Sequence, residues 1–350
     1  MHDQEDYVVH VGLIGYGYWG PNLLRNFAEL PGSQVIGVSD VRPERLELVR
    51  ARYPAVRTST NWLDLIGDPS IDAIAVATPV STHFDLAMKA LQAGKHVLVE
   101  KPIAASSEEA IRLIEEAERR KLVLMVDHTF VYTGAVRKIR ELVAEGKVGE
   151  IYYYDSVRVN LGLFQHEVDV MWDLAVHDLA IMIHVLGCVP SAIAATGMKH
   201  FQGGKENIAY ITAFFEGSMI AHINVNWLAP VKVRRTMIGG SRQMIVYDDL
   251  EITEKVKVYD RGVTFNPADT ERVYQELVGY RMGDMWAPKL DITEALRIEG
   301  QHFIDSIETG RRPITDGETG LRVVRILEAA TESMKARGKL VELEGRRAHA

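Results

Sequence analysis

The sequence has little of what would place this chain in a membrane or an oxidising compartment. It contains one cysteine, Cys188, so no disulfide can form within the chain, and its apolar setting in "VLGCVPSA" predicts a small buried side chain. No uninterrupted apolar run reaches the ~18 residues that a membrane-spanning helix needs. The opening "MHDQEDYVVH" does not have the pattern of a signal peptide. We therefore expect a cytoplasmic protein with no membrane partner.

Basic residues are also in the minority. The 350 residues include 40 Lys and Arg against 48 Asp and Glu, which gives a formal net charge of −8. Proteins that bind nucleic acid by neutralising phosphates need the opposite balance, so we expect no nucleic-acid partner. A hydrophobic content of 47% is ordinary for a globular protein, and the length favours two domains.

The first third of the chain alternates short apolar runs with amphipathic segments. The runs "YVVHVGLIG", "SQVIGVSD", "IDAIAVAT", "KHVLVE" and "KLVLMVDH" are rich in Val, Ile and Leu, as buried strands are. Strands of this kind, separated by helices, form a parallel sheet that is covered on both faces. Residues 1–127 are therefore predicted to be an α/β domain with a doubly wound parallel sheet.

After residue 127 the pattern changes to strands in which apolar and polar residues alternate, as in "SMIAHINVNW". This alternation predicts a sheet with one buried and one solvent-facing side. Residues 128–350 are predicted to be an α+β domain with an open, mainly antiparallel sheet, and its closing helices can pack back on the first domain. We expect the outward face, with Tyr152, Tyr154 and residues 214–215, to join subunits into a homodimer or homotetramer.

The strongest motif is "VGLIGYGYWGPNLLRNF". Gly15, Gly17 and Gly20 form G-x-G-x-x-G after the first strand and at the start of a helix, where a dinucleotide pyrophosphate binds. Asp40 ends the second strand, where a carboxylate can accept hydrogen bonds from both ribose hydroxyls. An acid at this position repels a 2′-phosphate, so NAD is favoured over NADP, although the neighbouring Arg42 leaves room for NADP. The alternative is that Asp40 only caps the following helix.

The segment "WDLAVHDLAIMIHVLG" reads as an apolar helix from Trp172 to Gly187 that carries Asp173, His177 and His184 along one side. These residues are either satisfied polar groups of the core or the lining of a cleft in which protons are transferred. His184 lies two turns beyond His177 and is interpreted as structural.

The segment "VLVEKPIA" places Glu100 and Lys101 at the carboxyl end of a predicted strand. Ligands of open α/β sheets bind at these strand ends, so Lys101 is expected to face the cofactor. A lysine there can donate to a substrate hydroxyl or take its proton. The alternative is an ordinary surface lysine.

Taken together, "GYGYWGPN", "GVSD", "ATPVSTH", "VEKP" and "WDLAVHDLAI" resemble the Gfo/Idh/MocA oxidoreductase family, and the resemblance covers essentially the whole chain. It implies a Rossmann domain, an open-sheet substrate domain, and hydride transfer between nicotinamide and a sugar or cyclitol carbon. It also implies that Lys101 contacts the reacting hydroxyl, that its bond to Pro102 is often cis, and that His177 of the D-x-x-x-H signature is the acid or base. The predicted cofactor-binding residues are Gly15, Gly17, Tyr18, Trp19, Gly20, Asp40, Thr78, Pro79, His83, Glu100 and Lys101, of which Thr78, Pro79 and His83 match the segment beside the nicotinamide.

The chemistry of alcohol oxidation agrees with this assignment, because removing a hydride from an alcohol carbon requires loss of the hydroxyl proton. Histidine titrates near neutral pH, Asp173 can orient its ring, and Lys101 can polarise the oxygen. The sequence leaves open whether Lys101 or His177 takes the proton. A metal site made from His166, Glu167, Asp169 and His177 matches no familiar zinc spacing, and we expect no metal.

The segment "VRVNLGLFQHEVDVMWDLAVHDLAI" resembles the branch of the family that oxidises the 3-hydroxyl of UDP-N-acetylglucosamine or its uronic acid. That resemblance implies a 3-keto sugar product and a pathway aminotransferase as partner. The alternatives are a dehydrogenase or reductase of a free polyol, inositol or deoxyketosugar, and a cofactor-binding regulator without chemistry. Arg158 and Asn160 are expected either to bind the substrate or to lie on the solvent-facing side of their strand. The predicted substrate-binding residues are Lys101, Arg158, Asn160, Gln165, Trp172, Asp173 and His177.

Overall fold

The computed structural model describes residues 8–162, 167–265 and 278–343. The chain divides into two compact units, Met1–Tyr132 with Thr293–Arg325, and Thr133–Ile292 with Ile326–Ala350. The boundary expected after residue 127 falls just before this division. The segment Thr293–Arg325 is the part of the closing helices that belongs to the first unit.

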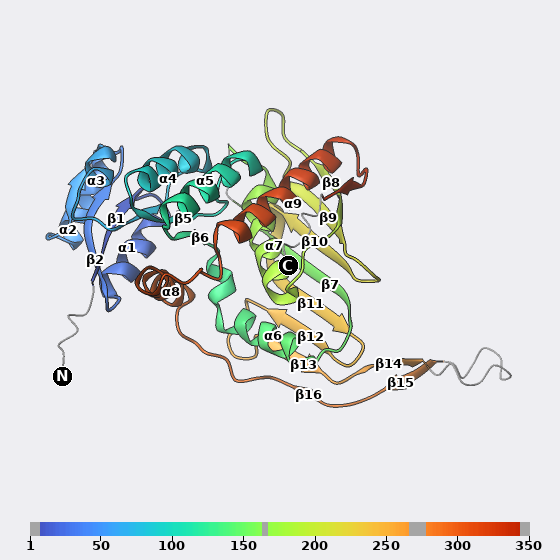
Figure 1. Cartoon of the computed structure of the whole chain (residues 1–350). Coiled ribbons are helices and arrows are strands. Elements are labelled where there is room, and N and C mark those ends of the chain that lie inside the picture. Colours follow the sequence, from blue (N-terminus) through green and yellow to red (C-terminus); the bar gives the residue numbers. More distant parts are fainter. Residues whose placement is uncertain (1–7, 163–166, 266–277, 344–350) are drawn as a thin grey trace, which may run out of the picture. The chain divides into compact units, whose positions relative to one another are not determined.

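The first unit is built on a parallel sheet of six strands in the order β3-β2-β1-β4-β5-β6 (Figure 1). The order reverses between β1 and β4, which is where folds of this kind bind their ligands. This confirms the predicted doubly wound α/β domain. The strands are β1 (Val9–Ile14), β2 (Ser33–Ser39), β3 (Arg57–Ser59), β4 (Ala73–Val76), β5 (His96–Glu100) and β6 (Leu124–Asp127).

Helices follow these strands in alternation. They are α1 (Gly20–Glu29), α2 (Pro43–Arg52), α3 (Leu63–Ile66), α4 (His83–Gln92), α5 (Ser107–Arg120) and α8 (Ala295–Thr309), with the short 3₁₀ helices η1 (Val80–Thr82) and η2 (Thr129–Tyr132). Although α8 comes late in the chain, it packs beside α1. Arg25 donates to both carboxylate oxygens of Glu294 at 2.9 and 2.6 Å, and the rings of Phe27 and Phe303 meet edge to face at 6.3 Å.

The second unit is built on a nine-stranded sheet in the order β16-β13-β12-β11-β7-β10-β9-β8-β17. Strands β7 and β10 run parallel, and the other pairs of this sheet run antiparallel, so the sheet is mixed but mainly antiparallel, as predicted. The strands are β7 (Ile151–Leu161), β8 (Ala192–Met198), β9 (Ile208–Phe214), β10 (Ile220–Asn226), β11 (Leu228–Gly240), β12 (Met244–Asp248), β13 (Val256–Tyr259), β16 (Met285–Trp286) and β17 (Val341–Glu342). A separate pair is formed by β14 (Gly262–Phe265) and β15 (Val278–Arg281).

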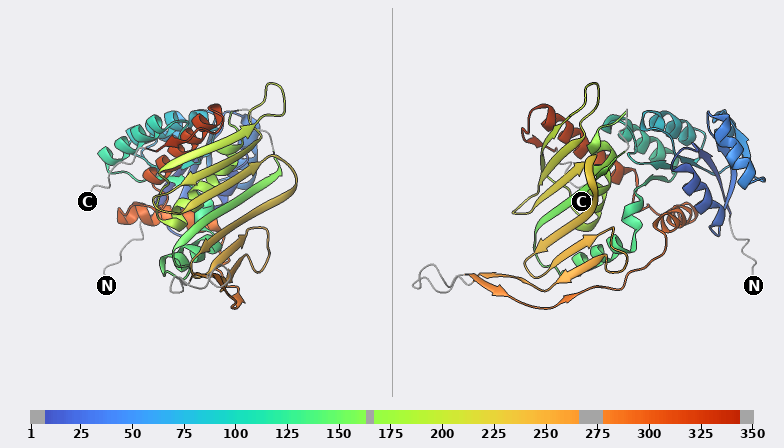
Figure 2. Two further views of the ribbon diagram at one scale, coloured as in Figure 1. Left: turned by 90° about the vertical axis from the view of Figure 1, so that its right-hand side faces the viewer. Right: turned by 180° about the vertical axis from the view of Figure 1, so that it is seen from behind.

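One face of this sheet is covered by α6 (Gly134–Ala144) and α7 (Val176–Leu186), which lie behind the strands in Figure 2 (left). The end of α9 (Gly317–Lys335) packs there too, where Ser333 Oγ accepts a hydrogen bond from the Ala195 amide at 2.8 Å. The predicted helix from Trp172 to Gly187 is not continuous. It begins with a π-helical turn, η3 (Met171–Ala175), and only then becomes α7, which ends at Gly187 in the left-handed conformation.

The burial of individual residues corrects three expectations. Tyr154 is fully buried and Phe215 is 7% exposed, so neither lies on the outward face. Strand alternation explains both, because their immediate neighbours Tyr153 and Phe214 point the other way. Cys188 is exposed rather than buried, since it follows Gly187 after the helix has ended. Among the described residues, no helix is both long and apolar enough to cross a membrane.

Candidate functional site

The G-x-G-x-x-G segment forms the turn from β1 into α1, and its glycines have three different reasons to lack a side chain. Gly15 has φ +98°, and a Cβ there would lie 2.3 Å from the Ala77 carbonyl oxygen. A Cβ on Gly20 would lie 2.2 Å from the Gly15 carbonyl oxygen, so this glycine permits the tight packing of helix on strand. A Cβ on Gly17 would meet only Arg42 at 3.7 Å, so the backbone here stays open to a pyrophosphate. These residues fit a dinucleotide.

Asp40 lies just beyond β2 and is 6% exposed. Its carboxylate accepts from the Tyr16 amide at 2.8 Å and from the Arg42 amide, Nε and Nη2 at 2.9 to 3.0 Å. Burial raises the pKa of Asp40, but the hydrogen bonds from Arg42 and Tyr16 outweigh it, and the pKa lies below its ordinary value. The acid is therefore ionised at neutral pH and placed beside the nucleotide loop, where an adenosine ribose is bound in this fold.

The segments after β4 and β5 are joined by His83. This imidazole is 1% exposed, and its nitrogens lie 2.8 Å from the carbonyl oxygens of Pro102 and Thr78. His83 thus fixes the backbone on either side rather than presenting its ring to solvent. Lys101 follows β5, is partly exposed, and its peptide bond to Pro102 is cis, as the resemblance implies.

The π-helical turn carries two of the predicted substrate residues. Asp169 caps it by accepting from the amides of Met171 and Trp172 at 2.9 and 3.1 Å. Trp172 donates from its indole to Thr331 at 3.1 Å. Asp173 accepts from the indole Nε1 of Trp227, a fully buried residue that the sequence analysis did not single out, also at 3.1 Å.

His177 is the second residue of the regular helix α7 and is partly exposed. The π-helical turn bonds residue i to i+5, so the four-residue spacing that placed Asp173 and His177 on one face does not apply unchanged. His184 lies in the regular helix seven residues further on. Burial, and then the charge of Arg140, lower the pKa of His184 to about 4, so it is neutral at neutral pH, in keeping with a structural histidine.

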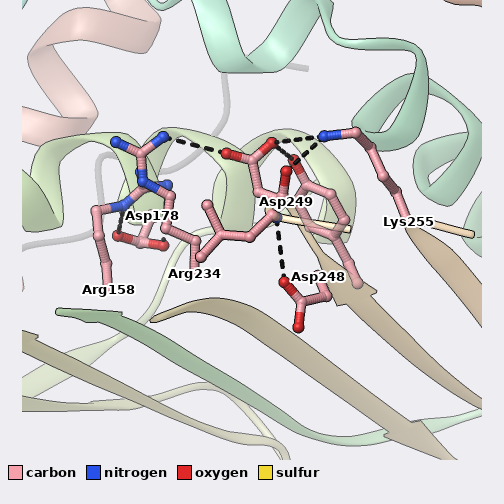
Figure 3. Close-up of polar contacts among 8 residues, drawn as sticks. Arg158, Asp178, Arg234, Asp248, Asp249 and Lys255 are labelled. Atoms are coloured by element: carbon pink, nitrogen blue, oxygen red, sulfur yellow. Dashed lines mark hydrogen bonds and ion pairs between the residues drawn. The ribbon is translucent and has the colours of Figure 1, made fainter. Parts of the chain in front are cut away.

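The residue after His177 anchors the helix to the sheet. Asp178 is 2% exposed and accepts from Ser156 Oγ and Arg158 Nε, each at 2.6 Å. Figure 3 shows Arg158 and Asp178 beside a second cluster, in which Arg234 and Lys255 approach Asp249 at 3.1 and 3.5 Å. Arg158 is 4% exposed, so the alternative that it lies on a wet face is wrong.

The structure therefore gathers the predicted residues into two groups. The cofactor residues and Lys101 lie in the first unit, and Arg158, Asn160, Trp172, Asp173 and His177 lie in the second. Gln165 and His166 lie outside the described residues. Among those that are described, no three His, Cys, Asp or Glu side chains are arranged to hold a metal ion.

Sequence reasoning missed Asp127, Asp178, Trp227 and Glu299. Two of them had a visible signal. Asp127 is the last residue of a buried parallel strand, and Asp40 comes directly after another such strand. Glu299 lies at helical spacing between the apolar residues Leu296 and Phe303.

Comparison with known proteins defines the class of this protein and then its family. Residues 9–128 match the model of an oxidoreductase family with an NAD-binding Rossmann fold, and residues 136–246 match the GFO/IDH/MocA C-terminal domain. The chain is therefore an oxidoreductase with an NAD-binding domain. It belongs to the Gfo/Idh/MocA family.

Relatives with known substrates act on sugars and cyclitols. UDP-N-acetylglucosamine 3-dehydrogenase of Acidithiobacillus ferrooxidans is 29% identical over 324 residues, which is 90% of this chain and 94% of that one. An NADP(+)-dependent scyllo-inositol 2-dehydrogenase of Bacillus subtilis is 25% identical over 93% of this chain and 94% of its own length. The solved structure of the A. ferrooxidans enzyme has a TM-score of 0.78 at 27% identity and covers 93% of this chain and 97% of that one.

Proposed function

We propose that this protein oxidises the 3-hydroxyl of a UDP-N-acetylhexosamine, or of its uronic acid, to a 3-keto sugar, with NAD as the oxidant. The observation that carries the proposal is the 29% identity to UDP-N-acetylglucosamine 3-dehydrogenase, against 23 to 25% for the inositol dehydrogenases. The second candidate is oxidation of a free inositol or another polyol, which those inositol relatives support.

The reaction removes a hydride from the carbinol carbon and a proton from its oxygen. NAD, when bound, supplies the hydride acceptor. In the proposal, the imidazole of His177 accepts the hydroxyl proton, and the Lys101 ammonium stabilises the negative charge that develops on the oxygen. Asp173, whose carboxylate accepts a hydrogen bond from the Trp227 indole, orients the imidazole of His177. Arg158 acts through Asp178 to hold the helix rather than by touching the sugar.

We also propose NAD rather than NADP as the working cofactor. The ionised, almost buried carboxylate of Asp40 suits two ribose hydroxyls and repels a 2′-phosphate. Arg42 is already paired with this carboxylate through two nitrogens, so the positive charge of Arg42 is offset.

The product is a reactive ketone, and we propose that a pathway aminotransferase consumes it.

A substrate and cofactor panel tests these proposals together. Purified protein is offered UDP-N-acetylglucosamine, its uronic acid and myo-inositol, each with NAD and with NADP, and an aminotransferase with an amino donor removes the ketone. We expect reduced nicotinamide with a nucleotide sugar and NAD. Turnover of inositol alone contradicts the nucleotide-sugar proposal, and faster reduction of NADP contradicts the assigned role of Asp40. No turnover with any substrate supports a cofactor-binding regulator instead.

We propose a second copy of this chain as the occupant of the sheet's open face, which is turned to the viewer in Figure 2 (left). Phe214, Ile220, Tyr153, Gly239 and Met244 pair in register across β9, β10, β7, β11 and β12. The register gives a row of aromatic and aliphatic side chains on one side of the sheet. Phe214 and Ile220 are 37% and 42% exposed, and an apolar row of this kind is usually covered by a partner.

Light scattering on the variant Ile220→Glu tests this interface. We expect the original chain to be a dimer or larger and the variant to be a monomer, because a carboxylate in the row must lose its water when the two copies meet. The matched control is Ile252→Glu, since Ile252 is 92% exposed and lies outside the row. A monomeric original chain, or a variant that stays associated, overturns the proposal.

A further inference from the structure

Three carboxyl groups meet inside the first unit at the ends of β5 and β6. Glu100 ends β5, Asp127 ends β6, and Glu299 comes from the middle of α8. Asp127 lies within hydrogen-bonding reach of both glutamates. Glu299 is fully buried and Asp127 is 2% exposed. Three ionised carboxylates cannot share such a site, because like charges in a medium of low dielectric repel strongly.

Burial and the charge of Asp127 raise the pKa of both glutamates, but Glu100 also accepts a hydrogen bond from the Lys101 amide at 3.2 Å, so Glu299 is the member of this cluster with the strongest reason to carry a proton. Among the described residues, neither of its carboxyl oxygens receives a hydrogen bond from a donor. The hydroxyl of Thr129 lies near Glu299 too, but the hydrogen bond that it donates in this geometry goes to Asp127. Two carboxyl groups that face each other form a hydrogen bond only when one of them is protonated.

The charges around Glu299 act in the same direction. Burial, followed by the neighbouring charges of Asp127 and Glu100, raises the pKa of Glu299 well above 4.5, while Thr129 lowers it by a smaller amount. Tyr132, on η2, also faces Glu299, and burial followed by that carboxyl raises its own pKa. No cation is among the groups that act on Glu299, so its neutral form is favoured at neutral pH.

Asp127 connects this acid to the nucleotide loop. Its Oδ2 accepts a hydrogen bond from the indole Nε1 of Trp19 at 3.0 Å. Trp19 precedes Gly20 at the start of α1, the point at which backbone amides face a pyrophosphate. Asp127 therefore holds one side of the loop, and it must keep its orientation in order to do so.

We propose that Glu299 is a positioning residue for the cofactor loop: as a neutral carboxylic acid it donates a hydrogen bond to the carboxylate of Asp127, which in turn holds the Trp19 indole. The late helix α8 thereby supports the NAD site without touching NAD. This inference concerns cofactor binding, so it stands whether or not the proposed sugar substrate is correct.

The test compares two replacements of Glu299 in the full chain and measures NAD affinity by isothermal titration calorimetry. Glu299→Gln keeps a neutral hydrogen-bond donor, whereas Glu299→Leu keeps the buried volume but has no donor. We expect the glutamine variant to bind NAD as the original chain does. The leucine variant should bind about tenfold more weakly, because a hydrogen bond to a charged group is lost. The matched control is Glu308→Gln, an exposed carboxyl on the same helix.

A double-mutant cycle with Trp19→Phe shows whether Glu299 acts through the indole. If it does, the leucine variant adds little to the loss already caused by Trp19→Phe, since both changes break the same chain of hydrogen bonds. Losses that simply add, wild-type affinity in the leucine variant, or equal losses in both Glu299 variants each overturn the proposal. A purely structural role would change melting temperature without this pattern in NAD affinity.

Thermal stability tests the protonated state separately. An acid whose pKa is raised on folding binds more protons in the folded than in the unfolded state, so its contribution to stability falls as pH rises above 4.5. The glutamine variant has no such group. We therefore expect its melting temperature to exceed that of the original chain by a margin that grows from about pH 5 to about pH 8. A margin that stays constant contradicts a neutral Glu299.

Discussion

Replacement of His177 by alanine is expected to lower kcat by about 10²- to 10⁴-fold, the range that a positioned acid or base contributes. The affinity for NAD should not change, because His177 is not among the predicted cofactor-binding residues, which include Gly15, Gly17, Gly20 and Asp40. The measurement is steady-state turnover with the sugar that proves active, together with a separate NAD titration. A fall in kcat with unchanged NAD binding places the loss in the chemical step.

The matched control for this prediction is His184→Gln. His184 lies on the same helix, its pKa is lowered to about 4, and it is neutral throughout the assay range. The variant His184→Gln should therefore retain turnover. If His177→Ala keeps full turnover, His177 is not the proton acceptor, and the corresponding test on Lys101 then decides whether the lysine takes that role.

Replacement of Asp178 by alanine is expected to cost about 3–5 kcal/mol in the free energy of unfolding, because it removes the carboxylate that forms a buried ion pair with the Arg158 guanidinium. The two groups are 2% and 4% exposed, and the pair is joined through Arg158 Nε at 2.6 Å. Burial lowers the pKa of Arg158, but the charge of Asp178 and its hydrogen bond raise it by more, so the pKa of Arg158 lies above its ordinary value. Urea unfolding followed by circular dichroism measures the loss.

Glu141→Ala is the control for Asp178→Ala. Glu141 pairs with Lys138 at 2.6 Å on the surface of α6, and its side chain is 51% exposed. Removing an exposed pair of this kind changes stability by about 0–1 kcal/mol. A loss below about 1 kcal/mol for Asp178→Ala contradicts the anchoring role, since it matches what the exposed pair contributes. The double variant Asp178→Leu with Arg158→Met should recover much of the stability, because an apolar pair of similar volume has no charge to desolvate.

Local sequence patterns were sufficient for the parts of the site that depend on backbone conformation. The glycine spacing and the strand before it predicted the nucleotide turn, because a φ of +98° at Gly15 and the close approach at Gly20 exclude other side chains. The start of α5 is likewise local, since Ser106 Oγ accepts a hydrogen bond from the Glu109 amide. These features involve neighbours in the chain, so their evidence is local.

The same patterns failed where the answer depended on partners distant in sequence. Helical spacing predicted one uninterrupted helix from Trp172, but a π-helical turn begins it. Alternation along β7 placed Tyr152 and Tyr154 on the outward face, but Tyr154 is fully buried, and Tyr153 is the residue that pairs with the exposed Ile220 of β10. For Arg158, the sequence offered substrate or a solvent-facing side of the strand, and only the fold showed that the residue is buried and paired with Asp178.

By itself, the sequence determined the order of strands and helices, the dinucleotide turn, the acid after β2, and the residue types of the predicted proton chemistry. Only the tertiary structure decided that α8 returns to α1, that Glu299 meets Asp127, and that Asp178 is paired with Arg158. The physical reason is that turns and strands are governed by conformational preferences of neighbouring residues. Whether a buried acid is neutral or ionised is instead governed by groups that folding brings from elsewhere in the chain.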